Sequence, residues 1–407
     1  MAALTALSTL PIIINYLHVP WTVALKNRLT STPGYPNRVC KIAFTVSYTN
    51  RDMISKALDF AFPMLESLDL HHPGLPGFYF PSTFLTTASK SLRQLKIFDA
   101  IFDGILASLA PLLLVMIALV DLTLHVNSIS TLSVSLLSLL QCLPFLRRLD
   151  VFVFSVAPPI HAIPGSVSLA ELTYLRLKGS TALLEQLISG LAIPSLQDLH
   201  VSLNCRHSAF HIPHLSNLIR YAGTLYVAAQ MTLSQSTFIL SLLTNLHLIN
   251  DTPFNIIADE QSSIAEISSE LSEMLATAED VTVAFLLPTP YQNDTVNLAL
   301  WRGFFEHLQN VKMLQLQHGL EIQVADILRQ DDTQPTINLF PSLEGIEVYK
   351  RDLYHIPISE SGHTSGLRPF EALVSARQQA AQPVKVYWHR DQVLPMPFYH
   401  IRNLLNW

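Results

Sequence analysis

The densest group of side chains that could do chemistry lies in the segment NCRHSAFHIPH, where one thiol and three imidazoles fall within ten residues. These groups belong to Cys205, His207, His211 and His214. Thiolate and imidazole are ligands that Zn²⁺ prefers, so a zinc enzyme built on this segment is one hypothesis. No second ligand cluster or supporting carboxylate accompanies the segment, and Pro213 favours a loop. We therefore interpret it as a polar loop, and expect neither a metal nor a cofactor.

Motifs that would support other reactions are missing from the sequence. It contains no GxGxxG, GxxxxGK, GxSxG or HExxH pattern, so phosphate-cradling loops and a nucleophile elbow have no support. The carboxylate pairs Asp331–Asp332 and Glu279–Asp280 consist of chain neighbours, whose side chains diverge on most backbones. Exposed carboxylates also have little perturbed pKa values, which disfavours paired acid and base work. The sequence thus predicts a protein that is not an enzyme.

Composition narrows the class of partner. The 407 residues carry 25 Lys and Arg against 31 Asp and Glu, a net charge of −6, whereas nucleic-acid binding needs clustered surplus cations. Hydrophobic residues make up 49% of the chain, which excludes general disorder. The uncharged stretch between Asp103 and Asp121 contains Pro111 and is short for a membrane span, so we expect a buried helix there. Neither nucleic acid nor membrane is an expected partner.

The cysteines and the N-terminus indicate a compartment. Cys40, Cys142 and Cys205 are odd in number and form no CxxC, which is typical of a reducing environment. No cation precedes Lys26, so the charged leader of a secretory signal is missing. We expect a cytoplasmic or nuclear protein.

A short repeat organises the chain: an apolar residue, two variable residues, an apolar residue, one variable residue and a third apolar residue. The central residues, here called anchors, are Ile42, Leu68, Leu95, Leu122, Leu149, Leu175, Leu199, Leu225 and Leu246. Successive anchors lie 26, 27, 27, 27, 26, 24, 26 and 21 residues apart, inside the range of about 20 to 29 for leucine-rich repeats. Three further anchors, Val281, Leu314 and Ile346, follow steps of 35, 33 and 32 residues.

Each anchor triplet predicts a strand, and the apolar periodicity of three and four between triplets predicts a helix. We expect helices within residues 103–116, 133–143, 182–192 and 294–310, with Asp103 and Thr181 as N-caps. Stacked units of this kind form an α/β leucine-rich-repeat solenoid, a curved parallel sheet with outer helices. We divide the chain into an N-terminal cap or F-box-like remnant (1–37), the repeat array (38–350), irregular after 250, and a loop with a capping helix and strand (351–407).

The variable residues between inward leucines should project from the concave strand face, because neighbouring strand residues point to opposite sides. We predict that this face binds a protein, since aromatic and Arg side chains dominate such interfaces. The predicted contact residues are Asp69, His71, Lys96, Phe98, His125, Asp150, Phe152, Arg176, Lys178, His200, Tyr226, His247, Gln315, Glu347 and Tyr349.

The chain also resembles the leucine-rich-repeat region of F-box proteins from mushroom-forming fungi. The likeness lies in the phrases at 92–98, 172–201, 301–317, 339–353 and 369–388. That resemblance implies a substrate receptor of a cullin-based ubiquitin ligase, in which an N-terminal F-box docks on a Skp-type adaptor. The F-box opening is echoed only by the segment from Leu10 to Ile14, with no acidic residue before Asp52. The alternative is a stand-alone regulatory repeat protein without ligase attachment.

Overall fold

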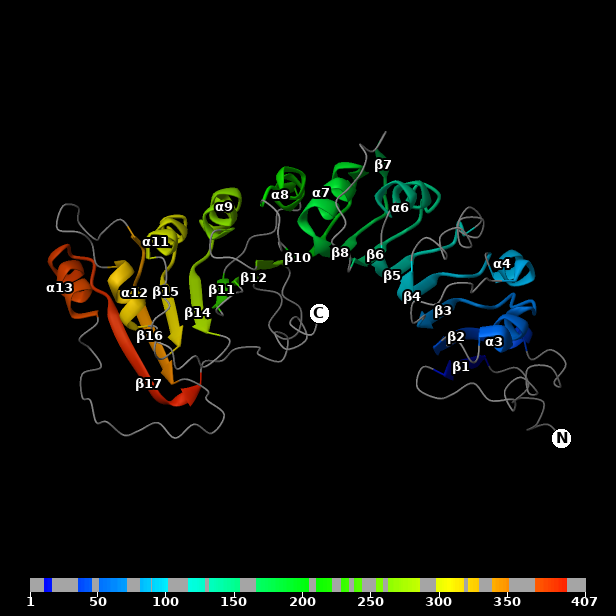
Figure 1. Ribbon diagram of the computed structural model, residues 1–407, viewed down its shortest axis with the longest axis horizontal. Helices are drawn as coiled ribbons and strands as arrows, with labels where there is room; N and C mark the ends of the chain where they lie inside the picture. Colours follow the sequence, from blue (N-terminus) through cyan, green and yellow to red (C-terminus); the bar gives the residue numbers. More distant parts are fainter. Residues whose placement is uncertain are drawn as a thin grey trace. The chain divides into compact units, whose positions relative to one another are not determined.

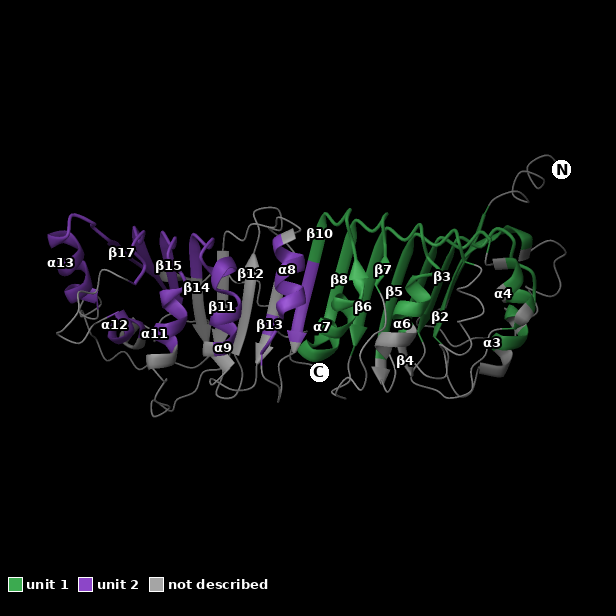
Figure 2. Ribbon diagram, turned by 90° about the horizontal axis from the view of Figure 1, so that it is seen from above, with its two compact units in different colours: residues 1–199 green, residues 200–407 purple. Residues whose placement is uncertain are grey.

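The computed structural model describes 17 segments, and every structural statement below concerns these residues. They are 11–16, 36–45, 51–71, 81–88, 90–101, 116–128, 132–153, 166–204, 210–221, 228–233, 238–243, 254–258, 263–285, 298–317, 321–328, 339–350 and 370–393. The chain divides into two compact units, residues 1–199 (unit 1) and 200–407 (unit 2), coloured separately in Figure 2. Each unit is described by itself. The three-part division expected from the sequence stays a prediction.

Unit 1 contains a parallel sheet in which the strands follow one another in chain order. Its strands are β1 (Ile12–Tyr16), β2 (Val39–Thr45), β3 (Ser67–His71), β4 (Gln94–Ile101), β5 (Asp121–Ser128), β6 (Arg148–Val153) and β8 (Tyr174–Ser180). The helices α3 (Arg51–Leu58), α4 (Ser82–Ala88), α6 (Leu132–Leu140) and α7 (Thr181–Ser189) lie on one side of this sheet (Figure 1). A short helix, η1 (Pro36–Arg38), leads into β2, and β7 (Val167–Ser168) pairs with β9 (Leu191–Ala192).

The strand register aligns the repeat. Ile42, Leu68, Leu95, Leu122, Leu149 and Leu175 each pair with the next along the sheet, which confirms the leucine-rich-repeat interpretation for this unit. All six anchors are at most 2% exposed. Burial of such a side chain stabilises the fold by about 1.5–3 kcal/mol. A strand that shifted by one residue would expose its anchor, so the anchors stabilise this register in every strand.

A backbone hydrogen-bond ladder joins successive repeats just before their strands. The Glu66 carbonyl accepts from the amides of Arg93 and Gln94, and the Arg93 carbonyl accepts from those of Val120 and Asp121. The same pattern continues through the carbonyls of Val120, Arg147 and Thr173. Since each repeat satisfies the backbone groups of the next, the units cannot shift past one another without leaving polar groups unpaired.

Unit 2 has a sheet of the order β10-β13-β12-β11-β14-β15-β16-β17. The strands are β10 (Asp198–Asn204, whose first two residues belong to unit 1), β11 (Ala228–Leu233), β12 (Phe238–Leu243), β13 (Phe254–Ala258), β14 (Asp280–Phe285), β15 (Met313–Gln317), β16 (Gly345–Lys350) and β17 (Lys385–Val393). The helices are α8 (Pro213–Tyr221), α9 (Ser263–Glu270), α10 (Ser272–Leu275), α11 (Leu298–Glu306), α12 (Glu321–Leu328) and α13 (Glu371–Gln379).

The later anchors follow the same rule as those of unit 1. Val281 pairs with Leu314 and Leu314 with Ile346, all fully buried, although these repeats are longer. Arg377 of α13 is 1% exposed and donates to the carbonyls of Leu339 and Phe340 at 2.7 and 2.5 Å. Arg377 therefore joins α13 to the turn that precedes β16, and the expected role of this helix as a cap stays a prediction.

Several expectations are wrong in detail. The sheet is not parallel throughout, because β12 pairs antiparallel with both β11 and β13. The β11–β12 hairpin lies in the chain between the expected anchors Leu225 and Leu246, and both anchors lie outside the described residues. Thr181 is not the N-cap of α7; Ser180 occupies that position without a side-chain bond, while Thr181 is 1% exposed inside the first turn. Pro213 begins helix α8, where proline's missing amide costs nothing.

Two further expectations concern the first 121 residues. Residues Ile12–Tyr16, which overlap the echo of an F-box opening, form a strand paired with β2 instead of a helix. Residues 102–115, where we expected a buried helix capped by Asp103, lie outside the described residues. Within the described part of the chain, no helix has the length and apolarity needed to cross a bilayer.

Candidate functional site

The face of each sheet opposite the helices is here called its open face. In unit 1 the buried anchors alternate with half-buried residues, as in β3, where Leu68 and Leu70 are buried and Ser67, Asp69 and His71 are not. Because the anchors share one register, side chains at equal positions on neighbouring strands fall into lanes across the open face. Uniform repeats thus turn separate variable residues into continuous surfaces.

The first lane, here called the ring ladder, consists of His71, Phe98, His125 and Phe152 on four successive strands. The His71 and Phe98 rings stack with centroids 4.3 Å apart, and the Phe98 and His125 rings meet edge to face at 4.4 Å. The His125 and Phe152 rings are 4.0 Å apart. The structure therefore brings together four residues that the sequence had predicted separately. Aromatic pairs of this geometry contribute about 0.5–1.5 kcal/mol each beyond their buried area.

Two cations of β8 end this ladder. The Arg176 guanidinium lies 5.1 Å from the centroid of the Phe152 ring, and the Lys178 ammonium lies 5.6 Å from the same centroid. Both distances fall within the range of about 6 Å for cation–π attraction. Phe152 is 8% exposed, so its ring is a largely dry support for two charged groups.

The second lane, here called the charge lane, consists of Asp69, Lys96, Thr123, Asp150 and Arg176 in strand order. Acidic and basic residues follow one another along it, apart from the buried Thr123. The Asp69 carboxylate lies 3.4 Å from the His71 imidazole and connects this lane to the ring ladder. Opposite charges on neighbouring strands attract, so the charge lane stabilises the register that the anchors set.

The pKa values of two groups at this end of the ladder, His125 and Lys178, are shifted. Burial, followed by the positive charges of Arg176, Lys178 and His71, lowers the pKa of His125 to about 4. Burial and the neighbouring Arg176 charge lower the pKa of Lys178 to about 8. Both shifts have the sign expected where cations gather on a partly desolvated surface. At neutral pH, His125 is an uncharged ring and Lys178 remains largely protonated.

A third lane was not predicted from the sequence. The Ser67 hydroxyl donates to Gln94 Oε1 at 2.9 Å, and Gln94 Nε2 donates to Asp121 Oδ2 at 2.8 Å. The Arg148 guanidinium then covers the Tyr174 ring at 3.8 Å. Each of these residues stands two positions before a residue of the charge lane on the same strand, and therefore projects from the same face. The alternation of side chains along a strand could have predicted them.

In unit 2, the open face carries a different group, here called the glutamate cluster: Gln315, Glu347, Tyr349 and His389. The Tyr349 hydroxyl donates to Glu347 Oε2 at 2.6 Å, and Gln315 Nε2 donates to the same oxygen at 3.3 Å. The Tyr349 and His389 rings stack at 4.3 Å, and His389 Nε2 lies 3.9 Å from Glu347 Oε1. Of these residues, the sequence predicted all but His389, which lies on the C-terminal strand.

The glutamate cluster shifts pKa values upward. Burial, the hydrogen bond to Glu347 and the charge of Glu347 raise the pKa of Tyr349 to about 12. Burial, followed by the charges of Glu279 and Glu347, raises the pKa of Asp280, against the smaller effect of Lys312. The expectation that exposed carboxylates are little perturbed therefore does not hold for Asp280, the first residue of β14.

Three predicted residues remain. His200 lies on β10 and is 5% exposed, while Tyr226 and His247 lie outside the described residues. Of the candidate zinc ligands, Cys205 and His207 also lie outside them. His211 Nδ1 lies 2.8 Å from Glu270 Oε1, and His214 is exposed on α8. The described residues contain no group of three or more His, Cys, Asp or Glu that could hold a metal ion.

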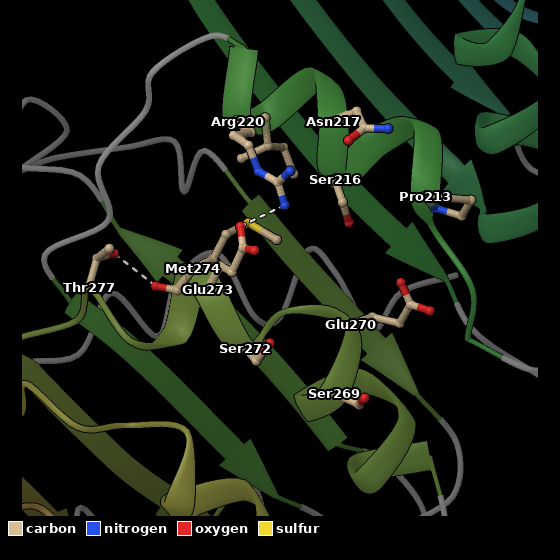
Figure 3. Close-up of a pocket in the computed structure, with 11 residues that line it drawn as sticks. Pro213, Ser216, Asn217, Arg220, Ser269, Glu270, Ser272, Glu273, Met274 and Thr277 are labelled. Atoms are coloured by element: carbon tan, nitrogen blue, oxygen red, sulfur yellow. Dashed lines mark hydrogen bonds and ion pairs between the residues drawn. The ribbon is translucent and has the colours of Figure 1, made fainter.

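The helix side of unit 2 has a pocket of about 510 Å³ between α8 and α9–α10 (Figure 3). In the chain, the strands β11, β12 and β13 lie between these helices, with no further described helix among them. Arg220 donates to Glu273 at 2.6 Å across the gap, and both side chains are exposed. Most of the lining residues are of polar type, among them Ser216, Asn217, Ser269 and Ser272.

No protein-family model and no curated protein matches the chain in sequence. Two solved structures resemble it at low identity. The leucine-rich repeat-containing protein LegL7 from Legionella pneumophila is 14% identical, over 89% of this chain and 95% of that one, with a TM-score of 0.29. An internalin (InlF) from Listeria monocytogenes is 11% identical, over 81% and 82%, with a TM-score of 0.28. Scores this low establish no shared arrangement, so the leucine-rich-repeat fold rests on this chain's own strand register.

Proposed function

We propose that this protein is a non-catalytic recognition scaffold that binds a protein partner on the open face of unit 1. The observation that carries the proposal is the ring ladder with its two cations. Rings and an arginine on a rigid sheet are the residue types that dominate protein interfaces, because they offer large contact areas at a small entropic cost. The anchors beneath them are fully buried, so the ladder is held by the core of the repeats.

A comparison of ladder variants with the wild-type chain tests this proposal. Phe98→Ala and His125→Ala should each weaken retention of the partner at least tenfold, as measured by quantitative mass spectrometry of proteins purified with the tagged chain. Lys90→Met, which removes an exposed charge from a turn of unit 1, is the matched control and should retain it. Equal retention by the ladder variants and the control would contradict the proposal.

A finer version of the proposal is that the chain is an F-box-like substrate receptor of a cullin-based ubiquitin ligase in the cytoplasm or nucleus. It is supported by the resemblance of the repeat phrases to fungal F-box proteins. In this version a Skp-type adaptor co-purifies with the chain, and the lifetime of the partner lengthens when the gene is deleted. Binding of the partner with an unchanged lifetime would favour the stand-alone regulator.

A further inference from the structure

The turns that precede the strands of unit 1 form one regular edge of the unit. In four of them the same backbone hydrogen bond closes the turn, since the amide of Leu65, Leu119, Leu146 or Leu172 donates to the carbonyl three residues earlier at 3.1–3.2 Å. The residues at both ends of these four turns are at most 1% exposed. The two central residues of each turn are therefore held outside the core, at fixed positions along the edge.

Three of these central residues are large and apolar. Met64, Ile117 and Phe145 are 56%, 61% and 57% exposed, and they are three of the five large apolar side chains that are exposed among the described residues. Exposed turns ordinarily carry Gly, Pro, Asn, Asp or Ser, so folding gives no reason for Ile or Phe here. Single exposed apolar residues need no explanation, but three at equivalent positions of one edge indicate a contact surface.

Opposite charges flank the apolar centre of this edge. Ile117 and Phe145 precede the neighbouring strands β5 and β6. One strand before them, the exposed Arg93 precedes β4. One strand after them, Glu171 precedes β8 and is 51% exposed, with the exposed Arg147 at 3.8 Å. The order along the edge is therefore cation, apolar, apolar, anion. The residues here called the turn edge are Met64, Arg93, Ile117, Phe145 and Glu171.

A row with this order is complementary to its own reverse. When a second copy meets the edge with its row running in the opposite direction, about a two-fold axis between β5 and β6, Ile117 faces Phe145 of the second copy. Arg93 then faces Glu171 of the second copy, and both contacts occur twice, as in every two-fold interface. Within one chain the backbones at Arg93 and Glu171 lie three strands apart, about 14 Å, so this pair can form only between copies.

From this self-complementarity we infer that a second copy of the chain docks on the turn edge of unit 1. The apolar side chains of both copies leave water at the centre, and the two Arg93–Glu171 pairs determine the direction of the rows. This interface goes beyond the proposed function, because the turn edge lies at the strand ends and not on the open face. An edge of five strands is about 19 Å long, so we expect weak association, with a Kd of about 10–100 µM.

Sedimentation velocity of the full chain between about 1 and 300 µM tests this inference. We expect the wild type to pass from monomer to dimer over this range. Phe145→Asp and Ile117→Asp should each weaken dimerisation at least tenfold, because each places two carboxylates in the apolar centre. The matched control Lys56→Glu, which reverses an exposed charge on α3, should dimerise within a factor of two of the wild type.

Charge reversal tests the direction of the rows. Arg93→Glu and Glu171→Arg should each weaken dimerisation at least fivefold, whereas the double variant should return to within about threefold of the wild type. Because the two residues lie three strands apart in one chain, only contact between copies can produce this rescue. Near-ultraviolet circular dichroism shows whether each variant is folded.

The inference is overturned if the wild type stays monomeric over the whole range, if Phe145→Asp dimerises as the wild type does, or if the double variant dimerises no better than the single variants. It is also overturned if a monomeric wild type, but not Phe145→Asp, sediments with phosphatidylserine vesicles, which would assign the turn edge to a membrane. Retention of the protein partner depends on the ring ladder, so failure here leaves the proposed function intact.

Discussion

The open faces of the two units share one construction and carry different titratable groups. In unit 1 the ring ladder ends in two cations and lowers the pKa values of His125 and Lys178. In unit 2 the glutamate cluster centres on one carboxylate and raises the pKa values of Tyr349 and Asp280. The anchors beneath both faces are nevertheless equivalent buried aliphatic residues. The buried core of the repeats thus determines the positions of the side chains on the open face, and the residues at the variable positions determine its chemistry.

The regularity of the repeats differs between the two units. Five steps of 26 or 27 residues carry the register from Ile42 to Leu175 without interruption, so rings on four strands can stack in sequence. In unit 2 the parallel register around Glu347 runs from β11 through β14, β15 and β16 to β17, and the antiparallel β12 ends it on the other side of β11. The hairpin therefore sets the limit of the parallel lanes in unit 2.

The largest expected effect tests whether the two cores are in fact equivalent. Leu122→Ala in unit 1 and Leu314→Ala in unit 2 should each lower the free energy of unfolding by about 3 kcal/mol, because both side chains are fully buried. Urea denaturation measures the change. The control Ile117→Ala, at a residue that is 61% exposed, should cost about 0.5 kcal/mol or less. A small loss at only one of the two anchors would break the comparison.

The next effect is a pH dependence that belongs to unit 1. The pKa of His125 is about 4 in the folded chain and about 6.5 in the unfolded one, so the unfolded chain binds the proton more tightly. The stability linked to this group is full above pH 6.5 and is lost as the pH falls toward 4, by about 2–3 kcal/mol. His125→Gln should lose less stability than the wild type between pH 7 and pH 4.5 in urea denaturation. Identical losses would mean that His125 is not held in the ladder.

The third effect isolates the ring that holds the two cations. Phe152→Leu keeps an apolar side chain but removes the ring beneath Arg176 and Lys178, so we expect a loss of about 1–2 kcal/mol in the free energy of unfolding. The pKa of Lys178 should also rise toward its ordinary value as water reaches the ammonium. Thermal denaturation and NMR titration of ¹⁵N-labelled lysine measure the two changes. An unchanged Lys178 pKa would show that the ring does not shield it.

The smallest effect has the opposite pH sign and belongs to unit 2. Tyr349→Phe removes the hydroxyl that donates to Glu347, with an expected cost of about 1 kcal/mol at pH 7. Since the folded pKa of Tyr349 is raised to about 12, the stability linked to it is full below pH 10 and is lost as the pH rises toward 12. Urea denaturation between pH 8 and pH 11 should show a weaker alkaline loss in Tyr349→Phe. A stronger alkaline loss in the variant would contradict this assignment.

Much of the fold could be predicted because the anchor residues recur at a nearly constant spacing in the sequence. The near-constant step from Ile42 to Leu175 determines both the strands and the lanes, so His71, Phe98, His125 and Phe152 were all assigned to one face. The β11–β12 hairpin could not be predicted, since apolar residues in this part of the chain also fit the repeat pattern. The spacing of apolar residues does not reveal whether a strand pairs parallel or antiparallel. The hydrogen bonds from Ser67 to Asp121 depend on side-chain rotamers, which the sequence does not specify.

One measurement tests the ring ladder most directly: the pKa of the His125 imidazole, obtained by NMR titration with His125→Gln to assign the signal. The ladder requires a half-buried ring between Phe98 and Phe152, facing the charges of Arg176 and Lys178, and the expected pKa is about 4. A pKa near the ordinary value of about 6.5 would mean that the ring is open to water and far from those cations, which would contradict the ladder.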